Sequence, residues 1–387
     1  MDQQNCVFIY SDAFQTYKFN DLHPFNQKRL ILTLDLIQQL DLIRPEQFVT
    51  PRMATEEELS VLLDPRFIEA VRQLDPSEPD KPPAFIDPEE FGLDTDDNPI
   101  FPGMYKASLL STGATLLAAE LVMEGKARHA LNLGGGLHHG LRDKAAGFCI
   151  FNDAAVAIAH LRKKYQARVL YIDTDAHHGD GVQWLFYDDP NVMTVSVHET
   201  GRYLFPGTGD VEERGTGAGL GYSINLPLDA FTEDDSYLEM IEQLLPTVVR
   251  SFRPDVIVSQ NGCDAHRFDP LTHLATSMRV FQAIPQIVHE LVHEFCDGRW
   301  IALGGGGYDI WRVVPRAWTL LWAEMNDIRL EDQPLPPAWL HRWQAESPVN
   351  LPPRLFDPPM KPIPRRAEIE AKNRRTLERL MWYVPKG

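Results

Sequence analysis

The sequence predicts an α/β fold in which a parallel sheet is covered by helices on both faces. Short apolar runs rich in β-branched residues alternate along the chain with longer helical patterns. The runs are apolar throughout rather than at every second position, which is typical of strands buried on both faces. Polar clusters follow five of these runs directly. Because ligands bind at the carboxyl ends of parallel strands, these clusters predict a functional site at that edge of the sheet.

Six runs are predicted to be strands and the stretches between them to be helices. The strands are Cys6–Tyr10, His129–Leu133, Val169–Asp173, Val192–Val197, Val256–Gln260 and Trp300–Leu303. The helices include Phe25–Gln39, Leu109–Glu124, Asn152–Lys164, Asp234–Phe252 and Ser277–Phe295. A helix between successive strands is the crossover connection that a parallel sheet requires.

Two stretches interrupt the alternation. Residues Asp75–Pro102 are rich in Pro and Asp, which predicts a long surface loop at the rim of the crevice. Prolines recur from Gln333 to Pro364, and Arg365–Tyr383 then has the pattern of a basic helix. We expect a catalytic domain over residues 1–330. Over residues 331–387 we expect a Pro-rich strap and a basic helix that pack on the same domain, rather than a partner-binding arm.

Composition limits the classes of partner and compartment. The 387 residues include 37 basic and 55 acidic side chains, and the net charge of -18 would repel a nucleic-acid backbone. The N-terminus lacks a basic segment followed by an apolar one, and no apolar run reaches the ~18 residues of a membrane helix. We therefore expect a cytoplasmic protein without membrane contact. The four cysteines form no Cys-x-x-Cys pair, which argues against disulfides and a thiolate metal site. The sequence does not indicate an oligomeric state.

The cluster after the third predicted strand has the spacing of metal ligands. Residues 173–181 read Asp-Thr-Asp-Ala-His-His-Gly-Asp-Gly. In an extended backbone Asp173, Asp175 and His177 lie on one face. Zinc binds imidazole nitrogen and carboxylate oxygen, and a catalytic zinc site keeps one position open. The alternative is a polar loop that caps the next helix, and the clusters at the other strand ends disfavour it.

The cluster after the second predicted strand combines glycines with paired histidines. Residues 134–140 read Gly-Gly-Gly-Leu-His-His-Gly. The glycines let the backbone approach a ligand closely, and His138 and His139 are candidate proton-transfer groups. A phosphate-binding loop is the competing interpretation. It is weak because the Lys-Ser/Thr ending of such a loop is missing.

Two further clusters follow the last two predicted strands. Asp264 comes after Val256–Gln260 and could complete a metal site of two carboxylates and one histidine with Asp175 and His177. Residues 304–308 read Gly-Gly-Gly-Gly-Tyr, a tight loop that could bring the Tyr308 phenol to a developing oxyanion. The alternative for Tyr308 is ordinary amphipathic packing.

Five ordered motifs resemble the zinc-dependent histone deacetylase family, and its bacterial acetoin-utilisation branch in particular. They are Gly-Gly-Leu-His-His at 135–139, Gly-Phe-Cys at 147–149, the acidic and histidine motif at 173–181, Phe-Pro-Gly-Thr-Gly at 205–209 and Gly-Gly-Gly-Gly-Tyr at 304–308. The resemblance extends from about His23 to about Trp318. It implies an arginase-deacetylase fold, a single domain with a mostly eight-stranded parallel sheet between helices. It also implies removal of acetyl or another short acyl group from the lysine side chain of proteins or from a related acylated amine.

The resemblance also implies roles for the matching positions. Asp175, His177 and Asp264 match the ligands of Zn²⁺, with Fe²⁺ as the alternative metal. The catalytic positions are His138 and His139, their respective partners Asp173 and Asp180, and the oxyanion-stabilising Tyr308. The positions expected to contact substrate are Gly147, Phe148, Phe205, Leu271, Gly306 and Arg29, the last at the inner end of the acyl-lysine tunnel. A structural K⁺ is implied near Asp173, Asp175, His177 and Ser196.

One departure from the family pattern concerns the rim of the tunnel. Class I deacetylases carry an Asp on the rim loop that grips the substrate backbone. The aligned segment here is Pro99–Tyr105, with Pro102 in the place of that Asp. This alignment predicts that other groups grip a peptide, or that the substrate is a small acylated amine.

Three alternative functions remain open from the sequence. The first is an acetylpolyamine amidohydrolase. The second is a two-manganese ureohydrolase of the arginase type, which needs a second set of metal ligands that the sequence does not clearly supply. The third is a catalytically silent acyl-lysine-binding scaffold, which is disfavoured because every position that the chemistry needs is filled.

Overall fold

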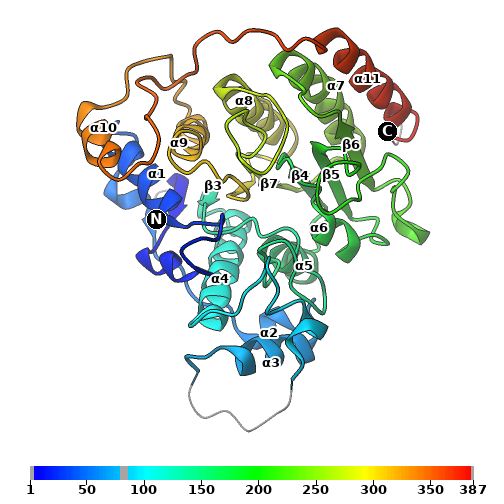
Figure 1. The fold of residues 1–387 in the computed structure, drawn as a ribbon. Coiled ribbons are helices and arrows are strands. Elements are labelled where there is room, and N and C mark those ends of the chain that lie inside the picture. Colours follow the sequence, from blue (N-terminus) through cyan, green and yellow to red (C-terminus); the bar gives the residue numbers. More distant parts are fainter. Residues whose placement is uncertain (1–3, 79–85, 385–387) are drawn as a thin grey trace.

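The computed structural model describes residues 4–78 and 86–384, which form one eight-stranded parallel sheet between two layers of helices (Figure 1). The strand order is β2-β1-β3-β8-β7-β4-β5-β6, and every neighbouring pair is parallel. The strands are β1 Gln4–Ile9, β2 Phe48–Val49, β3 Ala127–Asn132, β4 Val169–Asp173, β5 Val192–Glu199, β6 Ser223–Leu228, β7 Val256–Gln260 and β8 Trp300–Leu303. The predicted fold class is confirmed.

The helices form one layer on each face of the sheet (Figure 1). The first layer contains α1 Lys28–Gln39, α7 Asp234–Phe252, α8 Met278–Phe295, α9 Val314–Met325, α10 Pro337–Gln344 and α11 Arg366–Met381. The second contains α2 Glu56–Leu59, α3 Pro65–Leu74, α4 Met104–Met123 and α5 Asp153–Tyr165, with the short α6 Asp180–Leu185 packed on α5. In the described part of the chain, no helix combines the length and apolarity needed to span a bilayer.

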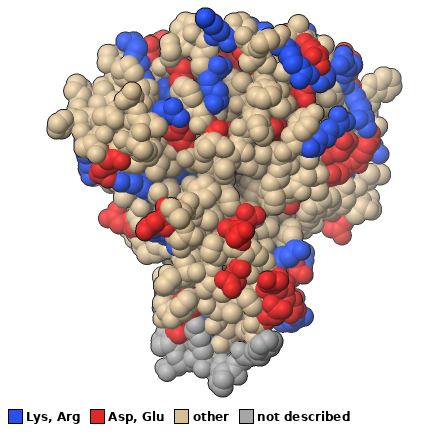
Figure 2. All heavy atoms as spheres, in the orientation of Figure 1, with Lys and Arg blue, Asp and Glu red and all other residues tan. Residues whose placement is uncertain are grey.

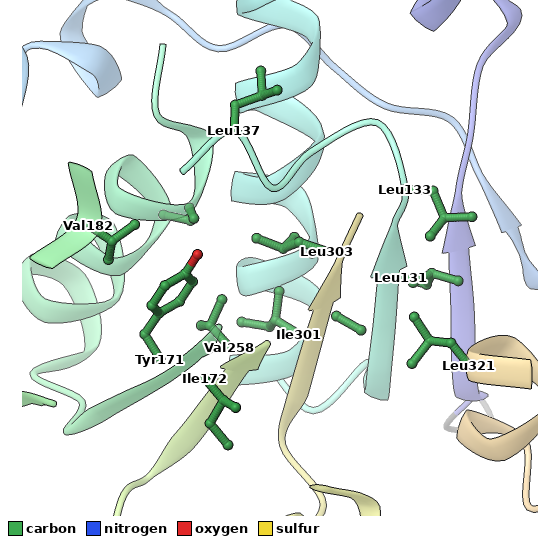
Figure 3. Packing of buried hydrophobic residues seen from close by; sticks show 14 of the residues in the cluster. Leu131, Leu133, Leu137, Tyr171, Ile172, Val182, Val258, Ile301, Leu303 and Leu321 are labelled. Carbon is green, nitrogen blue, oxygen red and sulfur yellow. The ribbon is translucent and has the colours of Figure 1, made fainter. Parts of the chain in front are cut away.

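The central strands form the core because both of their faces are covered (Figure 3). Leu131, Ile172, Val258, Ile301 and Leu303 are all fully buried. Full burial of each such side chain contributes roughly 1.5–3 kcal/mol. This rigid centre fixes the loops at the carboxyl ends of β3, β4, β7 and β8, where the polar clusters lie.

Two strands that the sequence did not predict complete the sheet at its edges. β2 has only two residues, and β6 contains Asn225 and Pro227, so neither has the continuous apolar pattern of a central strand. Both lie at the ends of the strand order. Proline is tolerated at Pro227 because an edge strand leaves one row of backbone groups unpaired.

The segment predicted as a rim loop is described in part. Residues 79–85 of Asp75–Pro102 lie outside the described residues. Asp75 accepts hydrogen bonds from the backbone N–H groups of Gly103 (2.9 Å) and Tyr105 (3.0 Å), which ties the start of the loop to the first turn of α4. α4 begins at Met104, five residues before the predicted start at Leu109.

The C-terminal segment contacts the layer of α7 and α8. α11 packs against α7 and β6. The Asp357 carboxylate accepts hydrogen bonds from the Arg316 guanidinium (2.9 Å) and the Met278 N–H (2.8 Å), and it contacts the His266 ring (3.0 Å). These contacts join the Pro-rich stretch to the start of α8 and to α9.

Candidate metal centre and substrate pocket

Asp175, His177 and Asp264 converge at the carboxyl ends of the adjacent strands β4 and β7. The Nδ1 atom of His177 lies 3.0 Å from Oδ1 of Asp175 and 2.9 Å from Oδ2 of Asp264. One ligand atom from each residue lies within 4.8 Å of the other two, and all three side chains are buried. The three predicted metal ligands therefore form one cluster.

Backbone and amide donors hold the two carboxylates in place. Oδ2 of Asp175 accepts from the Gly306 N–H (2.7 Å) and from Nε2 of Gln260 (2.8 Å). Oδ1 of Asp264 accepts from the Ala176 N–H at 2.7 Å. A Cβ atom on Gly306 would lie 2.4 Å from Oδ2 of Asp264 and 2.6 Å from Oδ2 of Asp175. Residue 306 must therefore be glycine to leave room for both carboxylates.

The electrostatics of this cluster favour a cation. Burial, together with the neighbouring Asp175, raises the pKa of Asp264 well above its usual range. Burial would also raise the pKa of Asp175, but His138 and His177 outweigh it and lower this pKa. Two buried carboxylates that both contact the His177 ring need a positive charge between them. A divalent ion bound by one imidazole nitrogen and two carboxylate oxygens fits this donor set.

His138 and His139 lie side by side next to the metal centre, each on its own carboxylate. Nδ1 of His138 is 2.7 Å from Oδ2 of Asp173, and Nδ1 of His139 is 2.6 Å from Oδ1 of Asp180. The two ring centroids are 4.0 Å apart. Each carboxylate fixes the orientation of its ring and directs Nε2 away from itself.

The environments of the two histidines push their pKa values in opposite directions. Burial alone would lower the pKa of His138, but the carboxylates of Asp173 and Asp175 outweigh burial and raise it to about 9. Burial and the neighbouring His138 lower the pKa of His139 to about 4, although Asp180 opposes the change. Separated pKa values are typical of a pair that divides acid and base roles.

The start of α5 holds the loop that carries the two histidines. The Asn152 amide donates to the carbonyls of His138 (3.0 Å) and Gly140 (2.9 Å). Asp153 accepts from the N–H groups of Gly136 (3.1 Å) and Leu137 (2.8 Å). Sequence reasoning missed these roles because Asn-Asp before an apolar helix has the pattern of an ordinary N-cap, and Asn152 does cap α5 as well.

A pocket of about 210 Å³ opens onto His139 and onto His177 of the metal centre. Its lining includes His139, His177, Tyr308 and the predicted substrate residues Gly147, Phe148, Phe205 and Leu271, together with Asp97 and Leu204. The Phe148 ring stands edge-on to Tyr308, and the Phe205 ring edge-on to His139. The pocket is therefore a channel with aromatic walls that ends at polar groups.

A hydrogen bond from its backbone N–H to Asp269 positions Tyr308 in the pocket wall. Its N–H donates to Oδ2 of the buried Asp269 at 2.8 Å. Asp269 also accepts from the Leu271 N–H at 2.9 Å, so one carboxylate positions two residues of the pocket wall. Burial raises the pKa of Asp269 to about 7.

Two predicted substrate residues do not line this pocket. Gly306 uses its N–H on Asp175 and its carbonyl on the Cys263 N–H (2.9 Å), so its backbone groups support the metal centre. Arg29 is buried behind the pocket, where Nη1 donates to the Gly307 carbonyl at 3.2 Å. Its guanidinium packs against the rings of Phe25 and Trp318.

The rim of the pocket corrects the alignment made from the sequence. Asp97 lies in the pocket lining and is exposed, whereas Pro102 does not line the pocket. The Asp97 carbonyl contacts Nε2 of His23 at 3.2 Å, which holds the loop over the opening. The rim therefore has a carboxylate, Asp97, whereas the alignment placed Pro102 at that position. Asp97 lies two residues before the aligned segment, which begins at Pro99.

His178 and Ser196 support the neighbouring loops. His178 contacts Oγ1 of Thr208 through Nδ1 (2.8 Å) and Oε1 of Gln183 through Nε2 (3.1 Å), which ties the loop of Phe205 to α6. Ser196 lies opposite Asp173 in the register of β4 and β5, and its Oγ accepts from the Gly179 N–H at 3.2 Å. No catalytic role had been predicted for His178, and the structure gives it a structural one.

Comparison with known proteins gives the same picture over most of the chain. The family model described as the histone deacetylase domain matches residues 23–325. The acetoin utilization protein AcuC of Bacillus subtilis is 54% identical over 98% of both chains. AcuC of Staphylococcus aureus strain MRSA252 is 43% identical over 97% of both chains.

Solved structures with the same fold include two homologues of histone deacetylases. One, an HDAC homologue in complex with SAHA, has a TM-score of 0.86 and 31% identity, covering 97% of this chain and 100% of that one. The other, an HDAC homologue from Aquifex aeolicus, has a TM-score of 0.82 and 30% identity, covering 96% and 100%. The five motifs, the metal-ligand cluster and these matches together show that the chain belongs to the histone deacetylase family.

Proposed function

We propose that this protein is a zinc-dependent deacetylase that hydrolyses the side-chain amide of acyl-lysine. Membership of the family supports the removal of an acetyl group from acetyl-lysine or a related amine. The observation that carries the proposal is the position of the buried Asp175–His177–Asp264 cluster beside His139 and Tyr308, at the end of a channel with aromatic walls. Zinc, with Fe²⁺ as the alternative, fits the donor set.

A divalent ion held by Asp175, His177 and Asp264 would polarise the amide carbonyl and a water molecule. The low pKa of His139 leaves its ring neutral at pH 7, so that Nε2 can accept a proton from the attacking water. His138 lies against His139 and is held by Asp173, so it can assist His139 in returning a proton to the leaving amine. The Tyr308 phenol, in the wall of the same pocket, donates to the oxyanion.

The pocket favours a linear amine with an acyl cap. Phe148 and Phe205 provide two aromatic walls that suit the butyl chain of lysine and exclude bulk water. The exposed Asp97 at the rim can accept hydrogen bonds from the backbone N–H groups of a peptide. A peptide substrate could therefore be held at the rim by this carboxylate. We also propose that K⁺ binds near Asp173, Asp175, His177 and Ser196, and that acetate leaves past Arg29.

The test is a hydrolysis screen of the Zn²⁺-loaded protein. It compares an acetyl-lysine peptide, free acetyl-lysine and acetylpolyamines, with Tyr308→Phe as the catalytic variant and Asp97→Asn as the rim variant. We expect peptide hydrolysis, a kcat lowered about 10²–10³-fold in Tyr308→Phe with little change in KM, and a raised KM only for the peptide in Asp97→Asn. Preference for acetylpolyamines would move the assignment to that class of amidohydrolase. Absence of hydrolysis on all substrates would favour the silent scaffold.

The arginase-type alternative makes a different prediction about metal ligands. A two-manganese site needs a second set of ligands next to the first. In the described residues, the other cluster with metal-ligand geometry consists of His129, His289 and His293, which are separate from the catalytic pocket. Guanidine hydrolysis by the manganese-loaded protein would overturn the deacetylase assignment.

A further inference from the structure

Three histidines converge near the start of β3, away from the strand ends that form the catalytic site. His129 lies in β3, and His289 and His293 lie one turn apart near the end of α8. Nε2 of His289 is 3.3 Å from Nε2 of His129 and 3.0 Å from Nε2 of His293. His129 and His289 are buried, whereas His293 is exposed, so the cluster can be reached from solvent.

A carboxylate fixes the tautomer of the central histidine. Nδ1 of His289 lies 3.0 Å from Oε1 of Glu324, near the end of α9. An ionised carboxylate only accepts hydrogen bonds, so the proton of His289 resides on Nδ1. The lone pair of Nε2 then points toward the other two rings. This is the arrangement in which a histidine binds a metal ion while a carboxylate orients it from behind.

The surroundings favour neutral rings at His129 and His293 and pack against the cluster. Burial lowers the pKa of His129 to about 3, and the neighbouring His289 and His293 add to the effect. Burial and His289 also lower the pKa of His293. The Trp300 ring packs 5.7 Å from both the His129 and the His289 ring centroids. Metal binding requires neutral imidazole, so neither His129 nor His293 has to lose a favourable charge on binding.

Two of the three nitrogen–nitrogen separations match those around a tetrahedral ion. Zinc–nitrogen bonds of ~2.0–2.1 Å place two ligand nitrogens about 3.3 Å apart. The two measured separations, 3.3 and 3.0 Å, are close to this value. Oδ1 of Asp327 lies 3.9 Å from Nε2 of His289, and this side chain is 73% exposed. A small rotation of that side chain would supply a fourth ligand.

We propose that His129, His289 and His293 form a second metal site, with Asp327 as the fourth ligand, for a divalent transition metal that prefers imidazole, such as Zn²⁺. The ion joins the start of β3 to the ends of α8 and α9. Its role is structural, because four protein ligands close the site. The alternative is a network in which His129 and His293 donate N–H protons to His289 without a metal.

The test counts Zn²⁺ ions per chain in the full-length protein after chelation and reloading, by calorimetric titration and elemental analysis. Wild type and the control His341→Ala, an exposed histidine on α10, should each bind two equivalents. His293→Ala should bind one and keep its hydrolase activity. Asp264→Asn should also bind one, because it alters the catalytic cluster only. One equivalent in wild type, or two in His293→Ala, would overturn the proposal.

A second measurement separates a built site from adventitious binding at an exposed histidine. Glu324→Gln leaves all three ring nitrogens in place but removes the carboxylate behind His289. It should weaken the second Zn²⁺ equivalent about 10–100-fold and leave the first unchanged. Zn²⁺ should also raise the Tm of Asp264→Asn but not that of Asp264→Asn/His293→Ala. An unchanged affinity in Glu324→Gln, or equal Tm shifts in the two variants, would contradict a carboxylate-oriented site.

Discussion

At the residue scale, the metal centre requires glycine at position 306. Gly306 lies so close to Asp175 and Asp264 that an added Cβ would come within 2.4–2.6 Å of a carboxylate oxygen on each. We expect Gly306→Ala to displace both oxygens and to weaken Zn²⁺ binding at the catalytic cluster at least about tenfold, with a parallel loss of activity. Gly125→Ala is the control, because its added Cβ meets no atom within 4 Å. Equal metal affinity in Gly306→Ala and wild type would show that the backbone can shift to accommodate the added Cβ without displacing the two carboxylates.

The pH dependence of the reaction follows from the histidine pair. Burial and His138 lower the pKa of His139 to about 4, below its ordinary value. A general base must be unprotonated, so a lowered pKa preserves activity at neutral pH and moves the loss of activity to acid. We expect the acid limb of the kcat/KM profile to lie below pH 6. A limb above pH 7 would mean that His139 is not the base.

The sequence predicted the residues that converge on the candidate site and the carboxylates behind the two histidines, but not the residues that position the surrounding loops. His138, His139, Asp175, His177, Asp264 and Tyr308 follow apolar strands in motifs with recognisable spacing. Asn152, Asp153, Asp269 and Asp97 act through the backbone or from loops, and their neighbours in space are distant along the chain. A one-dimensional pattern does not report such contacts.

At the element scale, Asp357 attaches the Pro-rich strap to helices α8 and α9. Burial alone would raise the pKa of Asp357, but the His266 ring and the Arg316 guanidinium outweigh burial and hold it well below its usual range. Asp357→Asn removes the charge and leaves buried donors without an acceptor. We expect a loss of about 3–5 kcal/mol in the free energy of unfolding. Asp332→Asn, which breaks the exposed ion pair with Arg354, is the matched control and should cost at most about 1 kcal/mol.

The stabilisation that Asp357 provides should be lost at acid pH. Because the folded pKa of Asp357 lies below the unfolded value of ~3.9, the stabilisation is present above about pH 4 and is lost as pH falls through the folded pKa. Chemical denaturation at several pH values should therefore show the difference between wild type and Asp357→Asn shrinking below pH 4. A constant difference would contradict the ionic attachment.

Central elements were predicted more accurately than edge elements. β4, β7, β8 and α7 have the predicted bounds, because strands covered on both faces and amphipathic helices have strong periodic signals. β2 and β6 were missed because edge strands need no continuous apolar pattern. α11 contacts α7 and β6 through tertiary packing. The prolines before α11 did not predict which elements it would contact.

At the scale of the whole molecule, charge should select among substrates. The chain carries a net charge of -18, and Figure 2 shows basic side chains gathered over α11 and acidic clusters elsewhere on that face. The exposed Asp97 at the pocket rim adds a local negative charge. We expect acetyl-lysine peptides with flanking Lys or Arg to have a lower KM than peptides with flanking Glu. The difference should shrink as salt rises, because the Debye length falls to about 3 Å at 1 M. A preference that does not depend on salt would indicate specific contacts instead.

Metal-dependent amide hydrolysis at the Asp175–His177–Asp264 cluster is tested most directly by reconstitution. The chelated protein is titrated with Zn²⁺ in the His293→Ala background, which leaves the catalytic cluster of the two candidate metal clusters found in the described residues, and hydrolysis of an acetyl-lysine peptide is followed. We predict no hydrolysis without metal, full activity at one equivalent of Zn²⁺, and none in the same protein with Asp264→Asn. Hydrolysis that persists without metal, or that survives Asp264→Asn, would contradict the account.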